Sequence, residues 1–330
     1  MKKIYKTKKW RKFNAKRSLK AIKNKRKRKN KKFIPSKIAD NSERKPLENI
    51  IAPEEFSFIN NTEKVLEYFQ LARNYLNLGY PIKFDISQIK TLTPDAIILQ
   101  IARIKDETFH KKTGIAGNAP NNPELKKLFL ESGFYNFVNT PGNKPNGKDT
   151  LIHKITKNKV EPQLAKQACL VGLKHAFQND NIFDPMFDIL IEIMQNTNNH
   201  AGETRGEYDW WLHIYNDPNT KTAKYTFLDL GLGIFESIPA QNFKRKLSQA
   251  IGITNNTSLV KPLFNGEIKS RTARPERGRG IPQVYESSQH KAFNEFIMIS
   301  NDVHVNMKNL KTIKLNYNFS GTLFYWELKK

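Results

Sequence analysis

Three polar residues able to bind a cation or move a proton recur at four-residue intervals in the second half of the chain: Glu192, Asn196 and His200. This interval places side chains on one face of a helix, so we expect a helix over 184–201. The glutamate could act as a general base, and the asparagine oxygen could ligate a hard cation. The alternative is that the three residues form the solvated face of an amphipathic helix.

A second polar group follows a predicted strand over 222–230, where Asp229 is followed by Gly231 and Gly233. The carboxylate could accept a hydrogen bond from the amino group of adenine. The glycines would let the backbone approach the base closely, because they have no β-carbon. An ordinary turn at the end of a strand is the alternative for this group.

Two further groups precede the last elements. Arg277, Gly278 and Gly280 come before a predicted helix near 281–290, whose N-terminus could receive phosphate oxygens. Thr322 follows a glycine at the start of the last predicted strand, where it could reach a base or serve as a plain strand residue. The basic stretch between Gly233 and Gly278 is long enough to be a lid, and a solvated loop is its alternative.

Taken in order, these four groups resemble the motifs of the GHKL superfamily of ATP-binding proteins, named after gyrase, histidine kinase and MutL. The resemblance spans residues 155–330, and the approach to Gly280 is similar to that of bacterial members of poorly defined role. It implies that ATP and Mg²⁺ are the ligands. It also implies that Asn196 ligates the magnesium, that Asp229 binds adenine, and that Gly278 and Gly280 wrap the phosphates.

The resemblance allows two activities for Glu192, and the sequence does not separate them. In hydrolytic members a glutamate at this position activates water, whereas in anti-sigma-factor kinases it activates a protein serine. Our leading hypothesis is an ATP-dependent conformational switch with slow hydrolysis, with a serine/threonine protein kinase or a non-hydrolysing ATP-binding adaptor as alternatives. His200 could contact phosphate, or it could pack against or cap the end of its helix.

Hydrophobic periodicity predicts the elements that must position these groups. The expected helices cover 161–178 and 184–201, and the expected strands cover 207–216, 222–230, 294–300, 303–307, 311–317 and 321–328. A long irregular stretch, 234–277, separates the two sets. This order predicts an α/β sandwich over 155–330 with an antiparallel or mixed sheet, and the resemblance to GHKL proteins implies that the sandwich is of the Bergerat type.

Residues 50–138 form a second predicted α/β domain, with helices over 63–78, 97–104 and 124–138 and a strand over 81–86. The segment from Phe84 to Ala96 resembles a STAS domain, the fold of anti-sigma-factor antagonists. Asp95 and its neighbours stand where those antagonists carry a phosphorylatable serine, so the resemblance implies a regulatory module for a protein partner. We expect Asp95 to cap the following helix, with a fixed negative charge as the alternative. A linker over 139–154 should join the two domains.

The net charge of +25 is concentrated at the N-terminus, since residues 1–39 contain 19 Lys or Arg and no acidic residue. Such a segment predicts a basic tail over 1–45 that is disordered when free. Aromatic residues interleaved with the charges favour nucleic acid as the partner of residues 1–33, with an anionic membrane surface or a solubilising role as alternatives. The single cysteine excludes an intramolecular disulfide, and the sequence lacks an apolar run of about 20 residues, so we expect a cytoplasmic protein outside the membrane. Homodimerisation is left open.

Overall fold

The computed structural model describes residues 45–106, 109, 114–140, 151–156, 160–179, 181–200, 208–238, 255–268 and 280–330. Residues 45–330 form one compact unit of mixed α/β structure, which confirms the expected fold class at that level. The basic tail predicted over 1–45 lies outside the described residues, apart from Lys45.

The first part of this unit, which we call the N-terminal layer, is built on a small parallel sheet. Its strands lie in the order β1 (Glu48–Ile51), β3 (Ile82–Asp85) and β5 (Ile115–Gly117). A short parallel pair joins β2 (Glu55–Phe56) to β4 (Thr91–Leu92). The helices of the layer are α2 (Thr62–Asn77), α3 (Pro94–Lys105) and α5 (Pro123–Glu131), and the 3₁₀ turn η2 (Phe134–Asn136) follows.

The second part is built on a five-stranded antiparallel sheet, which we call the large sheet. Its order is β6 (Leu151–Thr156), β7 (Tyr208–Asp217), β8 (Thr222–Asp229), β10 (Lys311–Leu328) and β9 (Phe293–Asn306). The strands are rich in aromatic and β-branched residues, which pack well on a pleated surface. Because β8 lies at the centre of the sheet, both of its backbone edges are paired.

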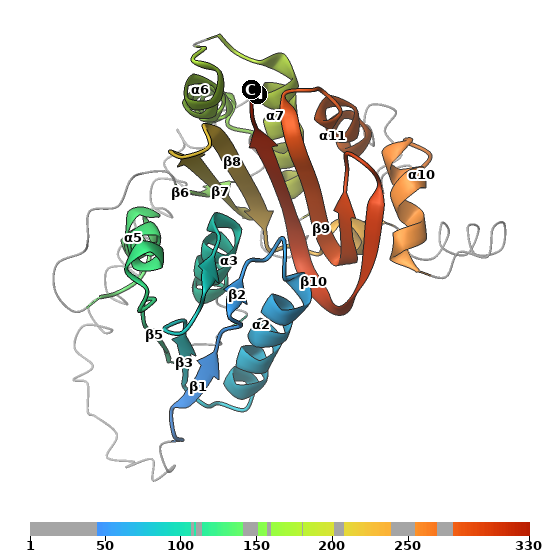
Figure 1. Ribbon diagram of the computed structural model, residues 1–330. Coiled ribbons are helices and arrows are strands. Elements are labelled where there is room, and N and C mark those ends of the chain that lie inside the picture. Colours follow the sequence, from blue (N-terminus) through green and yellow to red (C-terminus); the bar gives the residue numbers. More distant parts are fainter. Residues whose placement is uncertain are drawn as a thin grey trace, which may run out of the picture. The chain divides into compact units, whose positions relative to one another are not determined.

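Helices cover one face of the large sheet (Figure 1). The helices α6 (Pro162–Phe177) and α7 (Asp184–His200) pack on the strands, and α11 (Gly280–Ser288) packs on α7. The remaining elements are the single turn α8 (Ile234–Ser237), the 3₁₀ turn η3 (Asn256–Leu259) and α10 (Val260–Phe264). The hydroxyl of Tyr225 donates to the carbonyl of Ala168 at 2.7 Å, which fixes α6 close to the strands.

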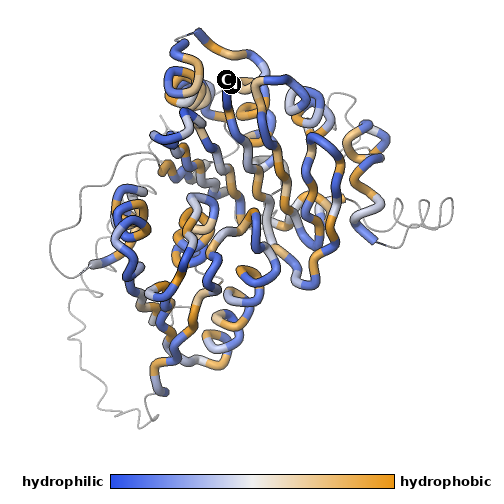
Figure 2. Tube along the Cα trace, viewed as in Figure 1, coloured by the Kyte–Doolittle hydropathy of each residue, from blue (hydrophilic) through white to orange (hydrophobic). Residues whose placement is uncertain are grey.

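The N-terminal layer covers the opposite face of the large sheet. The helix α3 contacts β7 and β8, and α2 contacts β10, so α3 lies between the small sheet and the large one (Figure 1). Every residue of α3 from Pro94 to Arg103 is buried. Apolar residues, orange in Figure 2, gather on α3 and along the strands of the large sheet. One hydrophobic cluster therefore joins both parts, with Phe58, Ile98, Trp211, Leu228 and Phe319 among its members.

The connection between the two parts differs from the linker expected over 139–154. Residues 151–154 belong to β6, which pairs with β7 at the edge of the large sheet. Leu151 is buried in the cluster that joins the two parts, and this burial favours the strand. The sequence ranges 50–138 and 155–330 thus share a core along the face of the large sheet.

Most expected elements are present, with boundaries shifted by a few residues. The helix expected over 124–138 is interrupted after Glu131, where Gly133 adopts a left-handed conformation with a φ of 82°. The two strand pairs expected near the C-terminus are continuous as β9 and β10, because a local irregularity near Asn301 bends the hairpin without ending it. The stretch expected to be irregular contains α8, η3 and α10.

None of the helices within the described ranges has both the length and the apolar character needed to cross a bilayer.

Candidate functional site

The helix α7 carries the first part of the candidate site. Its apolar residues Ile189, Ile193 and Met194 are buried in the core under the large sheet. Glu192 and Asn196 lie one turn apart and are half-buried. The amphipathic pattern therefore fixes the orientation of the helix, and the expected polar stripe is held at the edge of the core.

The N-terminus of α11 lies directly against this stripe. A β-carbon built on Gly280 would lie 2.8 Å from Oε2 of Glu192 and 3.1 Å from Oδ1 of Asn196. Residues without a side chain are the ones that permit such an approach. Two groups separated by more than 80 residues in the sequence are thus brought together, and the first residue of a nine-residue helix faces a carboxylate and an amide.

The electrostatics of this part of the site suit proton transfer. Burial raises the pKa of Glu192 above its usual value, and the nearby charge of Asp188 raises it further. A carboxylate with a raised pKa accepts a proton more readily near neutral pH. Nδ2 of Asn196 is buried, and it has no hydrogen-bond partner among the residues that the structure describes.

Asp229 forms the second part of the site, at the end of β8. The residue is 9% exposed, and Oδ1 accepts a hydrogen bond from the backbone N–H of Gly231 at 3.1 Å. Burial raises the pKa of Asp229 to about 7, although the hydrogen bonds from Gly231 and from the Thr197 side chain lower it. Since Thr197 adjoins Asn196 on α7, this contact makes the two parts of the site continuous.

Thr322 lies opposite Asp229 on the neighbouring strand, in the register that pairs β10 with β8. It is buried, and its hydroxyl lies 3.2 Å from the hydroxyl of Ser300 on β9. The predicted Asp229 and Thr322 groups therefore meet at one end of the central strands. The turn that leaves β8 contains Gly231 and Gly233, and the latter has a φ of 81°.

Three predicted residues are not placed. Arg277 and Gly278 lie outside the described residues, as does the side chain of His200, whose backbone forms the last turn of α7. The phosphate side of the candidate site is therefore represented by Gly280 alone.

Three polar residues that belong to none of the predicted motifs also lie at the site: Thr197, Ser300 and Asn301. Thr197 is buried although it follows the polar stripe, and its hydroxyl also lies 3.1 Å from the carbonyl of Ile193. The Ser300–Asn301 pair interrupts an apolar strand pattern, and that interruption was the available signal.

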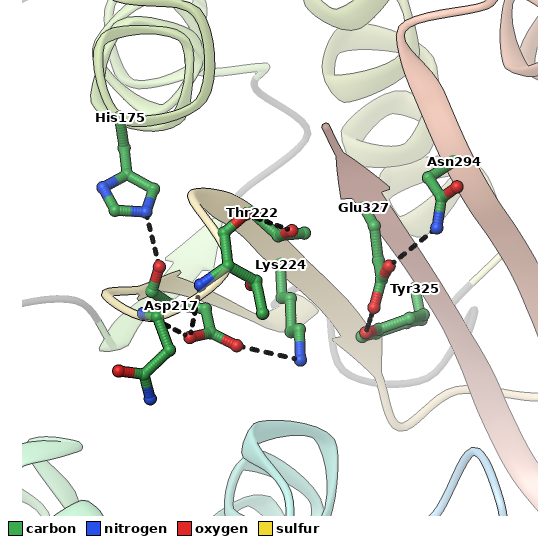
Figure 3. A network of polar contacts seen from close by, with 9 residues as sticks. His175, Asp217, Thr222, Lys224, Asn294, Tyr325 and Glu327 are labelled. Atoms are coloured by element: carbon green, nitrogen blue, oxygen red, sulfur yellow. Dashed lines mark hydrogen bonds and ion pairs between the residues drawn. The ribbon is translucent and has the colours of Figure 1, made fainter. Parts of the chain in front are cut away.

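A second polar network lies at the other end of β8, around the β7–β8 turn (Figure 3). His175 Nε2 donates to the carbonyl of Asp217 at 2.8 Å, and the carboxylate of Asp217 accepts the backbone N–H of Asn219 and pairs with Lys224. On the adjacent strands, the exposed Asn294 donates to Glu327 at 3.2 Å. The first set of groups bonds around the turn and the second bonds across two strands, and each is engaged within the fold as structural groups are.

Within the described ranges, no group of three or more His, Cys, Asp or Glu residues is arranged to hold a metal ion. No protein-family model matches this chain, and no curated protein matches its sequence.

Proposed function

We propose that residues 155–330 bind ATP together with Mg²⁺, as the resemblance to GHKL proteins implies. The observation that carries the proposal is the convergence of four separate sequence groups around the second half of α7. Gly280 lies against Glu192 and Asn196, and Thr197 links that stripe to Asp229, which faces Thr322 across the sheet.

The base would bind at Asp229. A buried carboxylate accepts a hydrogen bond from the adenine amino group. It discriminates against a base without this amino group, because burying polar groups that lack a hydrogen-bond partner costs free energy. The phosphates would lie toward the N-terminus of α11, where backbone N–H groups and the helix dipole favour anions. Arg277 and Gly278 precede this helix and would extend the same phosphate side.

Asn196 would hold the magnesium. Its side chain is half-buried, and Oδ1 lies beside Gly280 at the N-terminus of α11, where the phosphates would lie. Nδ2, which has no partner among the described residues, would donate to a phosphate oxygen. Magnesium prefers oxygen ligands and commonly binds one or two protein groups together with phosphate oxygens and water. When bound, the ion would supply neutralisation of phosphate charge. Glu192, one turn away, would accept a proton from a water molecule, and this role supports slow hydrolysis.

The N-terminal layer would respond to the nucleotide as a conformational switch. Its helix α3 packs on β7 and β8, and β8 ends in Asp229. Buried contacts of this kind can carry a small displacement from a ligand to the opposite face of a sheet. A STAS-like layer that senses ATP would then present its outer surface to a protein partner.

The basic N-terminal segment would hold the protein on nucleic acid. The proposal rests on composition alone, with 19 Lys or Arg and no acidic residue in residues 1–39. Binding of this type depends strongly on salt and little on sequence. Removal of residues 1–33 should abolish it without changing ATP affinity.

Titration calorimetry tests the proposed function. Native protein should bind ATP in the presence of Mg²⁺, Asp229→Asn should lose at least tenfold in affinity, and Asn196→Ala should lose the magnesium dependence. Asn294→Ala, which removes an exposed amide from β9, serves as the matched control and should bind like the native chain. Absence of ATP binding by folded native protein would refute the proposal. Transfer of the γ-phosphate to a protein, instead of release to water, would favour the kinase alternative.

A further inference from the structure

The strand β9 contains a buried polar interruption. Between apolar neighbours lie Ser300 and Asn301, which are 0% and 1% exposed. Asn301 has a φ of 52°, and the pairing with β10 shifts its register on both sides of the Phe319–Asn301 pair. A left-handed residue within a buried strand costs free energy, although asparagine tolerates this conformation better than most residues. The buried, left-handed Asn301 must therefore make contacts that offset its cost in free energy.

The side chain of Asn301 is fully engaged with the segment that leaves β8. Its Oδ1 accepts hydrogen bonds from the backbone N–H groups of Phe235 at 3.0 Å and Glu236 at 3.2 Å. Its Nδ2 donates to the carbonyl of Leu232 at 2.8 Å. The amide therefore caps α8 from a neighbouring strand and also fixes the end of the preceding turn.

Ser300 completes the same connection. Its hydroxyl accepts the backbone N–H of Ile234 at 2.8 Å and donates to the carbonyl of Gly321 at 3.0 Å. It also lies 3.2 Å from the hydroxyl of Thr322. Together with Asn301, it satisfies three consecutive backbone donors of α8 and links them to the strand that carries Thr322.

The close approach of Asn301 explains Gly233. A β-carbon at position 233 would lie 2.5–2.7 Å from the amide atoms of Asn301, and the φ of 81° also favours glycine. The sequence predicted that this glycine admits a base. The geometry instead assigns its small size to contact with Asn301, while the N–H of Gly231 bonds to the carboxylate of Asp229.

The turn at residues 229–233 is thus held at both ends. Asp229 is fixed by its place in the sheet, and the Leu232 end is fixed by Asn301. We infer that Ser300 and Asn301 are positioning residues that hold this turn and Thr322 in the geometry that reads the adenine base. The inference rests on the proposed function and concerns only the base side of the site, because neither residue bonds to Glu192, Asn196 or Gly280 in the described structure.

The test is the ratio of affinities for ATP and GTP, measured by titration calorimetry in Mg²⁺. GTP carries a carbonyl where ATP carries the amino group, so a well-placed Asp229 carboxylate should reject it. Asn301→Gly removes the amide and keeps the left-handed backbone, and we expect the preference for ATP to fall at least tenfold. Asn294→Ala on the same strand is the control and should keep the native ratio (Figure 3).

This ratio separates positioning from stability. A variant that is merely less folded loses affinity for both nucleotides by the same factor, so its ratio does not change. If Asn301→Gly fails to fold, Ser300→Ala and Asn301→Asp each remove part of the network and provide the same measurement. An unchanged ratio in folded variants would overturn the inference, as would native protein that binds ATP and GTP equally. Native protein that binds neither nucleotide would refute the proposed function itself.

Discussion

Two buried aspartates, on opposite faces of the large sheet, use their carboxylates differently. Asp95, at the start of α3, is 2% exposed, and its Oδ2 accepts the backbone N–H groups of Phe58 at 2.6 Å and Ile59 at 3.1 Å. Asp229, at the end of β8, bonds to the N–H of Gly231 within its own turn. Asp229 also accepts a hydrogen bond from the Thr197 side chain of α7. The first carboxylate therefore ties two backbone segments together, whereas the second is held by its own turn and by one side chain of a neighbouring helix.

The hydrogen-bond partners of the two carboxylates separate a structural aspartate from a candidate ligand-binding one. An ionised carboxylate has about four acceptor positions, and Oδ2 of Asp95 accepts two backbone N–H groups from another part of the chain. The hydrogen bonds of Asp229 instead orient the group at the edge of a turn, beside the polar stripe of α7. Burial alone does not distinguish them, because it raises the pKa of both groups.

The largest expected effect is on the free energy of unfolding, and it follows from removal of the structural carboxylate. Asp95→Ala should lower the free energy of unfolding by about 3–4 kcal/mol, because it leaves two buried N–H groups without an acceptor. Urea denaturation at pH 7 measures this loss. Glu67→Ala, which removes an exposed carboxylate paired with Lys64, is the control and should change stability by less than about 1 kcal/mol. If both variants behave alike, Asp95 does not tie the segments together.

A second prediction concerns how the stability contribution of Asp229 depends on pH. The pKa of Asp229 is about 7 in the folded protein and about 3.8 in the unfolded chain, so the folded state binds more protons between these values. The stability contribution of Asp229 therefore falls as pH rises from about 4 to 7. Asp229→Asn should remove this penalty and gain on the order of 2–4 kcal/mol relative to native above pH 7, with little difference near pH 4. A difference independent of pH would contradict the assignment.

A histidine on the sheet face that the N-terminal layer covers should contribute to stability with the opposite pH dependence. His213 is 1% exposed, its Nδ1 lies 3.4 Å from the carbonyl of Pro94, and burial lowers its pKa to about 4. Its ordinary pKa is 6.5, so the unfolded chain binds the extra proton and stability is lost as pH falls from about 6.5 to 4. His213→Gln should flatten this part of the stability profile by about 1–3 kcal/mol. A profile as steep as that of the native chain would exclude His213 as its source.

The smallest effect on folding is expected at the phosphate side. Gly280→Ala places a methyl group against the ends of the Glu192 and Asn196 side chains, which can move, so stability should change by less than about 1 kcal/mol. The affinity for ATP in the presence of Mg²⁺ should still fall about tenfold, because the added methyl group would crowd the bound phosphates. A loss of about 1.4 kcal/mol in binding free energy corresponds to that factor. Adenosine affinity should be unchanged. Gly114→Ala, where the nearest atom lies 3.8 Å away, is the control.

Periodicity made part of this arrangement predictable. Four-residue spacing places Glu192 and Asn196 on one face of α7 wherever the helix packs, and the structure has them there. Gly231 and Gly233 indicated a close approach of the backbone to a base, and the structure places the amide of Asn301 against Gly233. Local pattern indicates which residues need space, while the identity of the neighbour depends on tertiary packing.

The shared core was not predictable from the same patterns. The sequence suggested two domains, yet α3 is buried on all sides between the small sheet and the large one. Asp95 was expected to cap its helix or to present a charge, and it instead binds a turn more than 30 residues earlier. These contacts join segments far apart in the chain, and such partners leave no periodic signal in the sequence.

Hydrogen exchange with and without Mg²⁺ and ATP tests the central claim most directly. We expect slower exchange at the second half of α7, in the turn after Asp229 through α8, and at the first turn of α11, with a smaller change in α3. The strands β1 and β5 should exchange unchanged. Protection that appears elsewhere, or that is absent while ATP is bound, would contradict the claim that these segments form the nucleotide site.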